Sequence, residues 1–367
     1  MSDWTNSVLT GDVRERLDDL PDDSVHMVMT SPPYWNLRDY GHEDQLGLEA
    51  SPEEYVEHIA DVLDAVARVL RPDGSLWLNL GDTYDSKDLQ QIPARVALEC
   101  QSRGWILRNR VTWVKPNPMP QSVKDRLNTT TEQVFHLTPN PDYWYDLDAI
   151  REEYSESTIE REKHDINHQP RQSIYNEDTL NQSDLTHPAG KNPGDVFEVT
   201  TKPFPDAHFA VYPPELCEKP LKATCPPEVC AECGSPYERQ VDHEKIPLNE
   251  LPESNPNYRP NTYARYNGVG EDRNDASEKR TLPARETTGW EPTCDCDTDA
   301  TEAGIVLDPF AGAGTTLLKA KELGRKFVGI EINPEYADMA RGRVGLTPND
   351  PSNIRDDENQ SGLEAYE

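Results

Sequence analysis

The sequence predicts a doubly wound α/β fold, built on a mostly parallel sheet and interrupted by a loop-rich insertion. Three observations lead to this prediction. Short apolar runs alternate with amphipathic, helix-like stretches through residues 1–140. The alternation stops in a polar stretch that continues to about residue 300. It returns at residues 301–346, so both ends of the chain are expected to contribute to the sheet.

The individual elements follow from the spacing of apolar residues. Strands are expected near residues 7–10, 25–29, 76–80, 111–114, 305–307 and 327–330, and helices near 13–20, 51–70, 90–103 and 315–323. The second helix is the best defined, because Ser51 can cap it, Pro52 suits its first position and Glu54 completes a capping box.

The chain is strongly acidic. Its 367 residues carry 36 basic and 68 acidic side chains, which gives a net charge of −32. Because phosphates attract basic surfaces, this balance alone argues against a nucleic-acid partner. With only 35% hydrophobic residues, either extensive disorder or a folded, halophilic protein with an acidic surface explains the composition. The ordered motifs below favour the second explanation.

The N-terminus lacks the basic and apolar segments of a signal peptide, and no stretch approaches the roughly 18 apolar residues of a membrane span. We therefore expect a cytoplasmic protein with no membrane partner. In that compartment the seven cysteines are expected to be reduced or metal-bound rather than paired in disulfides.

A glycine-rich turn follows the strand near 305–307 and opens a helix. It reads Asp308-Pro309-Phe310-Ala311-Gly312-Ala313-Gly314-Thr315-Thr316. Glycines let the backbone approach a ligand, and a helix N-terminus offers free N–H groups. Glu331 ends the next strand, where a carboxylate can bind two ribose hydroxyls. The pattern lacks the lysine of a P-loop, and alone it leaves open a purely structural turn.

A second motif, Thr30-Ser31-Pro32-Pro33-Tyr34-Trp35, follows the strand near 25–29. Its two prolines remove two N–H donors and stiffen the turn. The Ser31 hydroxyl, the Pro32 carbonyl and the Tyr34 ring could then hold an –NH₂ group and stack on the ring that carries it. An ordinary proline turn with a buried Tyr34 is the alternative, and Trp35 fits either base contact or core packing.

Together these two segments resemble the amino-methyltransferase family of DNA modification enzymes. In that family a tetrapeptide of the type Asp/Asn/Ser-Pro-Pro-Tyr/Phe is catalytic, and Asp-Pro-Phe-x-Gly-x-Gly-Thr-Thr binds S-adenosylmethionine. The order seen here, with the catalytic segment first, is similar to the beta subclass. Shorter matches support the resemblance at Gly11-Asp12, at His208-Phe209-Ala210-Val211-Tyr212-Pro213 and at Gly329-Ile330-Glu331-Ile332-Asn333.

The resemblance implies a methyltransferase sheet of about seven strands that acts on double-stranded DNA with S-adenosylmethionine as cofactor. It implies catalytic roles for Ser31, Pro32, Pro33 and Tyr34. It implies cofactor contacts for Asp12, Phe209, Asp308, Pro309, Phe310, Gly312, Gly314, Thr315, Thr316, Glu331 and Asn333. Serine at the first catalytic position is similar to most cytosine-N4 enzymes, so cytosine N4 is the expected acceptor. Adenine N6 stays open, as does a catalytically inactive, zinc-containing DNA-binding protein.

The expected chemistry is activation of an amino group. Its nitrogen is a poor nucleophile because the lone pair is delocalised into the base. Accepting its N–H bonds at Ser31 and at the Pro32 carbonyl would free that lone pair for the sulfonium methyl. Positioning and electrostatics of this kind are worth about 7–11 kcal/mol. A target inside a duplex must also be flipped out, and Tyr34 is the expected stacking partner.

A local excess of positive charge lies between Ser102 and Arg126, where six basic residues accompany a single acid, Asp125. Basic residues interleaved with polar and aromatic ones suit phosphate contacts, although scattered surface charge would look the same. The candidate DNA contacts are Arg108, Arg110, Lys115, Lys124 and Arg126.

Four cysteines form two close pairs, Cys230-x-x-Cys233 and Cys294-x-Cys296. The first pair, followed by a glycine, has the shape of a zinc knuckle. The gap of about 60 residues is long for a compact zinc ribbon, Cys225 is a substitute ligand, and free thiols or a disulfide are alternatives. We expect a structural zinc that pins the ends of the polar loop 234–293.

These motifs divide the chain. Residues 1–140 are expected to form the catalytic half of the methyltransferase domain, 201–224 a further segment of it and 301–346 its cofactor-binding half. A candidate target-recognition region (141–200) and a Cys-rich module (225–300) lie between them, and 347–367 form an acidic tail expected to be disordered. Candidate base-reading residues are Arg161, Asn167, Arg171, Asn181, Arg259 and Arg265. No nuclease-like motif is evident, so a cognate restriction endonuclease would be a separate chain.

Overall fold

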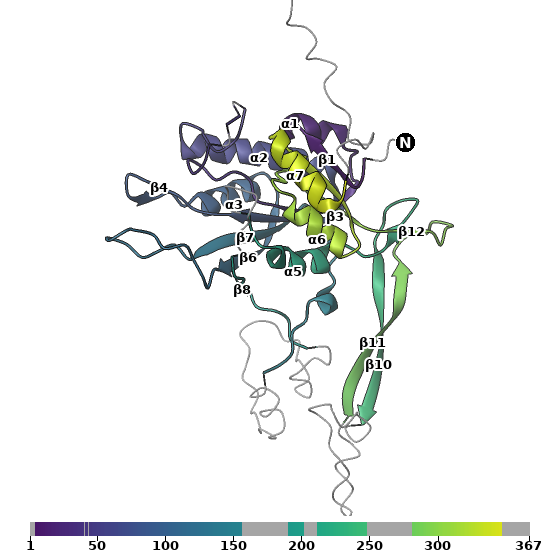
Figure 1. Ribbon diagram of the computed structural model, residues 1–367. Coiled ribbons are helices and arrows are strands. Elements are labelled where there is room, and N and C mark those ends of the chain that lie inside the picture. Colours follow the sequence, from purple (N-terminus) through teal and green to yellow (C-terminus); the bar gives the residue numbers. More distant parts are fainter. Residues whose placement is uncertain are drawn as a thin grey trace, which may run out of the picture. The chain divides into compact units, whose positions relative to one another are not determined.

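The computed structural model is shown in Figure 1. It describes residues 4–39, 41–42, 44–155, 190–201, 211–247 and 281–346. The chain forms two compact units. The first comprises Met1–Asp146, Gly194–Tyr237 and Pro292–Glu367, and the second comprises Leu147–Pro193 and Glu238–Glu291. The larger unit contains every element discussed below except the hairpin strands of the insertion.

An eight-stranded sheet organises the larger unit. Its spatial order is β1 (Ser7–Thr10), β14 (Lys326–Glu331), β13 (Ile305–Asp308), β2 (Val25–Thr30), β3 (Leu70–Leu80), β7 (Thr131–Thr138), β6 (Ile106–Val114) and β8 (Val196–Glu198). The first five strands are parallel, whereas β7 runs antiparallel to both β3 and β6. The predicted mostly parallel sheet is confirmed.

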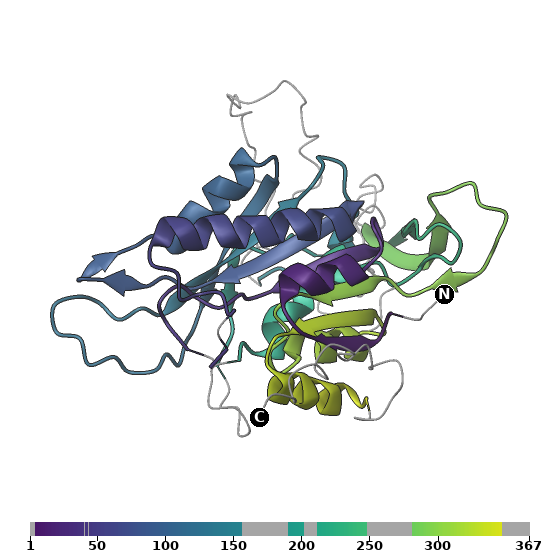
Figure 2. The ribbon, with the colours of Figure 1, turned by 90° about the horizontal axis from the view of Figure 1, so that it is seen from above.

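Helices cover both faces of this sheet, as a doubly wound fold requires. One face carries α1 (Val13–Arg16), α2 (Pro52–Val69) and α3 (Ile92–Ser102), and the other carries α5 (Pro214–Thr224), α6 (Thr315–Glu322) and α7 (Pro334–Val344). Alternate side chains of one strand enter the two cores: Leu76 and Leu78 join the first and Trp77 the second. Helices α2 and α3 lie side by side (Figures 1 and 2).

The capping box expected at residue 51 is present. Ser51 Oγ accepts a hydrogen bond from the Glu54 amide at 3.2 Å, and the Glu54 carboxylate accepts one from the Ala50 amide at 3.2 Å. Pro52 occupies the first turn. This start signal, together with the apolar stripe of Val56, Ile59 and Leu63, explains why α2 begins where the sequence predicts.

The order of strands brings distant parts of the chain together. Strand β13, near the C-terminus, pairs with β2 near the N-terminus through Val306 with Met27 and Leu307 with Val28. The loops that follow these two parallel strands therefore leave the same edge of the sheet, next to each other. In open α/β sheets this edge, where the strand order reverses, is where ligands bind.

The structure departs from the sequence-based elements at several points, and β8, α5 and α7 have no counterpart among the predicted elements. The sheet has eight strands rather than about seven, and β7 was not predicted, because its polar start (Thr131-Glu132-Gln133) hides the apolar run that follows. The first helix is short and ends in a 3₁₀ turn at Leu17–Asp19. The insertion contains a two-stranded sheet of β10 (Tyr237–Pro247) and β11 (Thr281–Pro292) where loops were expected.

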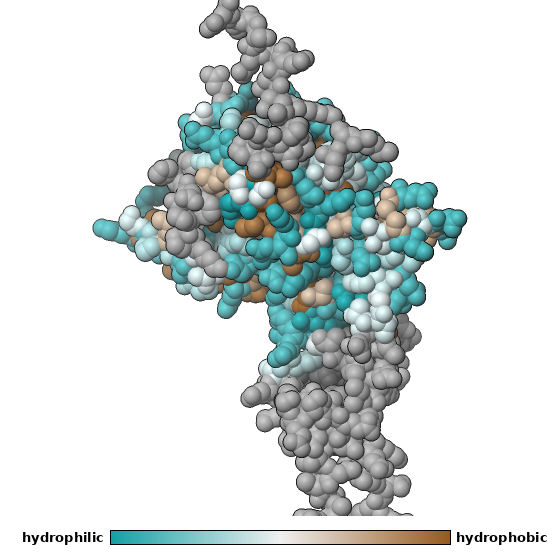
Figure 3. Space-filling view, turned by 45° about the vertical axis from the view of Figure 1, so that its right-hand side comes forward, coloured by the Kyte–Doolittle hydropathy of each residue, from teal (hydrophilic) through white to brown (hydrophobic). Residues whose placement is uncertain are grey.

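On the face shown in Figure 3, hydrophilic residues dominate the coloured area and apolar surface gathers near its centre. Within the described part of the chain, no helix is long and apolar enough to cross a membrane.

His136 on β7 is buried in neutral form and makes stability depend on pH. Its ring stacks on Trp77 at 4.3 Å between centroids, and its Nε2 lies 3.1 Å from Ser75 Oγ. Burial, followed by the charge of Arg108, lowers the pKa of His136 to about 3. Because an unfolded histidine titrates near pH 6.5, the folded protein binds fewer protons than the unfolded chain between these values.

The stability that the neutral His136 ring contributes is therefore complete above about pH 6.5 and is lost as the pH falls through that window. A His136→Gln variant has no imidazole to take up a proton on unfolding, so it lacks this pH dependence. We expect the wild type to be more stable than the variant at pH 7, and this difference in free energy of unfolding to fall by roughly 3 kcal/mol between pH 7 and pH 4. Urea unfolding of both proteins at each pH measures this, and a constant difference would contradict it.

Candidate active site

The two predicted loops meet at the edge where β2 and β13 end. Thr30 is the last residue of β2 and Asp308 is the last residue of β13. Thr30 Oγ1 donates a hydrogen bond of 2.7 Å to Asp308 Oδ1. Asp308 is 1% exposed and also accepts bonds from the Phe310 amide at 3.1 Å and the Tyr212 hydroxyl at 3.2 Å. Burial raises the pKa of its carboxyl. Through these hydrogen bonds, Asp308 joins the glycine-rich loop to the loop that follows β2 and contains Ser31 to Tyr34 (the Ser31 loop).

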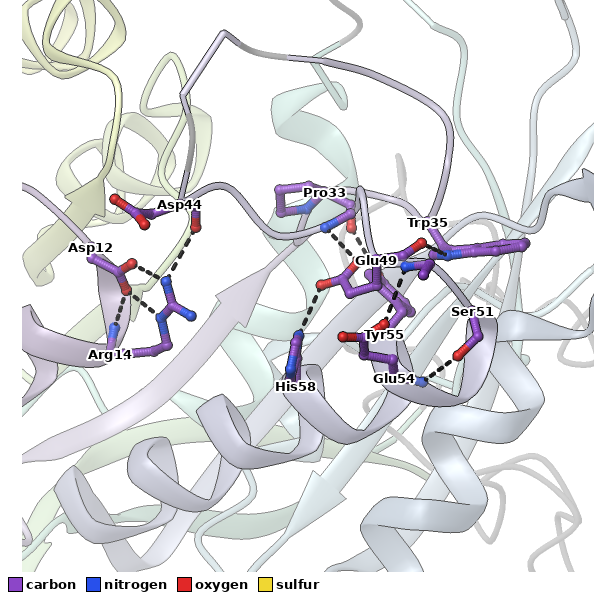
Figure 4. A network of polar contacts seen from close by, with 12 residues as sticks. Asp12, Arg14, Pro33, Trp35, Asp44, Glu49, Ser51, Glu54, Tyr55 and His58 are labelled. Carbon is purple, nitrogen blue, oxygen red and sulfur yellow. Dashed lines mark hydrogen bonds and ion pairs between the residues drawn. The ribbon is translucent and has the colours of Figure 1, made fainter.

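Hydrogen bonds connect the Ser-Pro-Pro-Tyr motif and the residue after it to helix α2 and to the segment before it (Figure 4). The Tyr55 hydroxyl on α2 donates to the Pro33 carbonyl at 2.8 Å. Trp35 Nε1 donates to the Glu49 carbonyl at 3.0 Å, and Glu49 contacts His58 of α2. Trp35 is buried in the core, so the structure gives it the packing role. These contacts hold the proline turn rigid, as its two prolines suggested.

Ser31 and Tyr34 belong to a polar cluster with residues of β3 and β7. The Ser31 hydroxyl donates to the Tyr34 oxygen at 3.2 Å, and the Tyr34 hydroxyl donates to Glu132 Oε2 at 2.7 Å. Asn79 Nδ2 donates to the Tyr34 oxygen and to Glu132 Oε2, each at 2.8 Å. The other oxygen of Glu132 pairs with the Lys115 ammonium. Burial raises the pKa of Tyr34 well above its usual value, so the phenol stays protonated.

The Tyr34 ring lies against the end of strand β3. A Cβ atom added to Gly81 would come within 2.4 Å of Tyr34 Cε2. Only glycine leaves room for the ring in this position. The ring is thus fixed on one side by backbone and at its hydroxyl by the polar cluster.

The glycine-rich loop packs against Glu331 at the end of β14. The Gly312 amide donates to Glu331 Oε2 at 2.7 Å, and the Asn333 amide donates to Oε1 at 2.9 Å. Burial raises the pKa of this carboxyl. Gly314 has a φ of 75° at the start of α6, with Ala340 of α7 only 2.9 Å from where a Cβ would be. Glycine is required there by both conformation and space.

Several predicted cofactor residues have structural partners. Asp12 caps α1 through the Arg14 amide and pairs with the Arg14 side chain, which also reaches the Asp44 carbonyl (Figure 4). Asn333 caps α7 by accepting from the Glu335 amide at 2.9 Å. Thr315 accepts from Arg343 at 3.1 Å. Pro309 is buried and Phe310 packs against the core, while Thr316 contacts Tyr212. Phe209 lies outside the described residues.

Comparisons with known proteins match this geometry. The family model described as "DNA methylase" matches residues 25–230 and 299–342, which include the Ser31 loop, the glycine-rich loop and Glu331. The chain belongs to this DNA methylase family. It is 28% identical to the Type II methyltransferase M.SmaI of Serratia marcescens, over 92% of this chain and 90% of that protein. It is 30% identical to the Type II methyltransferase M.XycI of Xanthomonas campestris pv. cyanopsidis, over 92% and 87%.

A solved structure shares the fold of this DNA methylase. The PvuII DNA methyltransferase (cytosine-N4-specific) superposes with a TM-score of 0.53 at 16% identity, covering 94% of this chain and 88% of that one. The resemblance to the amino-methyltransferase family drawn from the sequence is thereby confirmed.

The predicted DNA-contact residues of this DNA methylase do not form one group. Lys124 and Arg126 lie in the β6–β7 loop, where the Arg126 guanidinium sits 4.0 Å from the Tyr84 ring centroid. This loop leaves the sheet at the same edge as the Ser31 loop, because β7 begins beside the end of β3. Arg108 lies toward the opposite end of β6, where it donates to Tyr143, and Arg110 is exposed between the two ends.

Two basic residues of the predicted basic segment form ion pairs with acidic residues of the DNA methylase itself. Lys115 pairs with Glu132 and lies 4.6 Å from the Trp113 ring centroid. Arg103 bridges three acids, Asp61, Asp64 and Glu99. Counting charges along the sequence therefore overstates the positive surface available to phosphate. The six candidate base-reading residues, Arg161, Asn167, Arg171, Asn181, Arg259 and Arg265, lie outside the described residues, as does the acidic tail.

The two cysteine pairs come together in space. The sulfur atoms of Cys230, Cys233, Cys294 and Cys296 lie within 4.8 Å of one another. Cys225, considered as a substitute ligand, is buried outside this cluster. Short strands β9 (Val229–Cys230) and β12 (Thr301–Glu302) pair next to the cluster. The turn after Cys230 is closed by a bond from the Gly234 amide to the Cys230 carbonyl at 2.8 Å.

The turn that carries Cys233 is bonded to the central sheet. His26 on β2 contacts the Gly234 carbonyl at 2.9 Å through Nε2 and accepts from the Ile305 amide through Nδ1 at 3.1 Å. Arg71 on β3 donates to the Cys233 carbonyl at 3.2 Å. Burial lowers the pKa of His26 to about 4, so the ring is neutral and can bridge in this way.

Sequence reasoning missed Asn79 and Glu132 as members of the site, and it gave Tyr212 no role of its own, although Tyr212 lies in the segment His208–Pro213 that supports the resemblance. Asn79 interrupts an apolar run one residue before β3 ends, and a polar residue there is a usable signal, because strand ends at this edge form sites. Glu132 carries no local signal. The contacts of Glu132 and Tyr212 depend on the pairing of β7 with β3 and on the packing of α5.

Proposed function

We propose that this DNA methylase transfers a methyl group from S-adenosylmethionine to N4 of cytosine in duplex DNA. The observation that carries the proposal is the Ser31 hydroxyl, whose hydrogen is directed at Tyr34 and which follows Thr30, the residue bonded to Asp308 of the glycine-rich loop. Asn79 Nδ2 donates to Ser31 Oγ at 3.3 Å, and the remaining lone pair is left to accept an amino N–H. Serine at this position, and a fold shared with an enzyme described as cytosine-N4-specific, favour cytosine over adenine.

The residues present fit S-adenosylmethionine. Glu331 keeps acceptor capacity beyond its two backbone bonds, since each carboxylate oxygen can accept a second donor. It would bind the ribose hydroxyls. The glycine-rich loop, with Gly312 and Gly314 at positive φ, would lie along the methionine portion. The bound cofactor supplies an electrophilic sulfonium methyl, and the protein positions the amino group in line with it.

The chain's own groups would do the remaining work. Ser31 Oγ and the Pro32 carbonyl would accept the amino hydrogens, which localises the nitrogen lone pair. Tyr34 would stack on the base once it is flipped from the duplex. Lys124 and Arg126 are the proposed phosphate contacts at this edge. Because the named relatives are Type II methyltransferases, we propose that this enzyme protects a recognition site against a separate endonuclease.

Pre-methylated substrates test the choice of base. The same DNA would be copied with N6-methyl-dATP or with N4-methyl-dCTP in place of the ordinary nucleotide, and transfer of tritiated methyl groups would be measured in concentrated potassium chloride. We expect label on the copies that carry N6-methyladenine and none on those that carry N4-methylcytosine. The reverse pattern would assign the enzyme to adenine N6.

We further propose that the four clustered cysteines bind a structural zinc ion. Four thiolates around a tetrahedral zinc lie about 3.8 Å apart for Zn–S bonds near 2.3 Å, which is compatible with sulfurs within 4.8 Å of one another. Four protein ligands leave no open position for catalysis. In the chain, the two pairs flank residues 238–291, so the ion would close the base of that insertion.

Zinc analysis tests this proposal. We expect about one zinc per chain in the purified protein, and a Cys230→Ser, Cys233→Ser double variant that loses it and melts at a lower temperature. A Cys225→Ala variant is the matched control, since it removes a buried cysteine outside the cluster and should keep the metal. Metal-free wild-type protein with an unchanged melting temperature in the double variant would refute a zinc site.

A further inference from the structure

The Ser31 hydroxyl activates the amino group only if its hydrogen points away from the substrate. A hydroxyl can donate or accept, and the choice depends on its neighbours. Here Ser31 donates to the Tyr34 oxygen, 3.2 Å away. The Tyr34 hydroxyl donates its own hydrogen to Glu132 Oε2, 2.7 Å away. The Tyr34 oxygen is therefore free to accept the hydrogen of Ser31.

An ionised carboxylate has no hydrogen to donate, so it fixes the direction of every bond that ends on it. Two further donors hold the Glu132 carboxylate in place. The Lys115 ammonium pairs with Oε1, and Asn79 Nδ2 donates to Oε2 at 2.8 Å. The side chains of both charged residues are largely shielded, with 14% exposure for Glu132 and 21% for Lys115.

We propose that Glu132 is a positioning residue that sets the polarity of the chain Ser31–Tyr34–Glu132, so that Ser31 presents only lone pairs to the amino group. Asn79 reinforces the same direction, because its Nδ2 donates to the Tyr34 oxygen at 2.8 Å and to Ser31 Oγ at 3.3 Å, which leaves one Ser31 lone pair for the amino group. Glu132 acts through Tyr34 and does not touch the substrate. The inference rests on the proposed role of Ser31 and applies equally to a cytosine or an adenine amino group.

Glu132→Gln reverses this polarity with little change of shape. The glutamine oxygen faces the Lys115 ammonium, so its –NH₂ group faces the Tyr34 oxygen and donates to it, while Asn79 Nδ2 loses Glu132 Oε2 as an acceptor. The Tyr34 hydrogen then turns toward Ser31, and the Ser31 hydrogen turns toward the substrate. We expect the single-turnover rate of methyl transfer to fall about 10²-fold, with unchanged affinity for S-adenosylmethionine and DNA in samples shown to be folded at the assay temperature.

A double-mutant cycle separates this role from simple destabilisation. Tyr34→Phe keeps the ring and removes the hydroxyl through which Glu132 acts. In that background Glu132→Gln is expected to have no further effect on the rate, because the path to Ser31 is already broken. Multiplicative losses of rate in the folded double variant would overturn the proposal.

Two controls keep the outcomes distinct. Glu57→Gln makes the same change at an exposed position of α2 and should leave the rate unchanged. A wild-type enzyme that transfers no methyl group to DNA would defeat the proposed function itself. An active wild type with an equally fast Glu132→Gln variant would defeat only the role assigned to Glu132.

Discussion

Ser31→Ala is expected to slow methyl transfer by about 10²–10³-fold, the range seen when one preorganised group is removed from an active site. The substitution deletes the acceptor that would localise the amino lone pair. It should leave the fold intact, because the Ser31 hydroxyl contacts only Tyr34 and Asn79 among the described residues. Binding of S-adenosylmethionine should also be unchanged.

Single-turnover transfer of labelled methyl groups measures this effect, and calorimetry measures cofactor affinity in the same samples. Ser102→Ala, which removes an exposed hydroxyl at the end of α3, is the matched control. A rate within a few-fold of wild type in Ser31→Ala would remove the catalytic role from this loop.

Glu331→Ala is expected to weaken S-adenosylmethionine binding by roughly 10²-fold or more. Hydrogen bonds to a charged group contribute about 1.5–3 kcal/mol each, and the carboxylate would bind two ribose hydroxyls. The change also frees the Gly312 and Asn333 amides that the carboxylate now holds. The loop is therefore expected to lose order as well as a direct contact.

Titration calorimetry with S-adenosylmethionine gives the dissociation constant directly. Glu335→Ala, an exposed acid in the first turn of α7, is the matched control and should bind as wild type does. Unchanged affinity in Glu331→Ala would place the ribose elsewhere.

The sequence alone predicted the parts of the site that are continuous in the chain. Ser31 to Tyr34 and Asp308 to Thr316 each follow a recognisable apolar strand, so both motif and edge could be inferred. The junction between them, from Thr30 to Asp308, depends on β2 lying next to β13. Strand order of that kind is set by packing of the whole sheet and is not encoded in either segment.

Residues that act through strand register could not be predicted. Glu132 reaches Tyr34 because β7 pairs with β3 in a register that sets Asn79 opposite Val134. A shift by one residue would turn Glu132 to the other face of the sheet. The cysteine pairs are a contrasting case. Their spacing predicted a zinc site, whereas the sequence could not show that the four sulfurs converge.

Residue type and charge do not show which protein partner a side chain has. Asp12 and Asn333 are engaged as helix N-caps, a function that Asp and Asn serve widely. Lys115 is a candidate phosphate contact in the sequence, and the structure pairs it with Glu132, which accepts from Tyr34. Sequence position gives the sign of a charge and not the partner that neutralises it.

The product of the reaction tests the central claim most directly. The purified protein would be incubated in concentrated potassium chloride with unmethylated duplex DNA and S-adenosylmethionine, and the DNA would be digested to nucleosides for mass spectrometry. Ser31→Ala protein serves as the negative control. We predict N4-methyldeoxycytidine in the wild-type sample alone. N6-methyldeoxyadenosine, or no methylated nucleoside from folded protein that binds the cofactor, would contradict the proposed function.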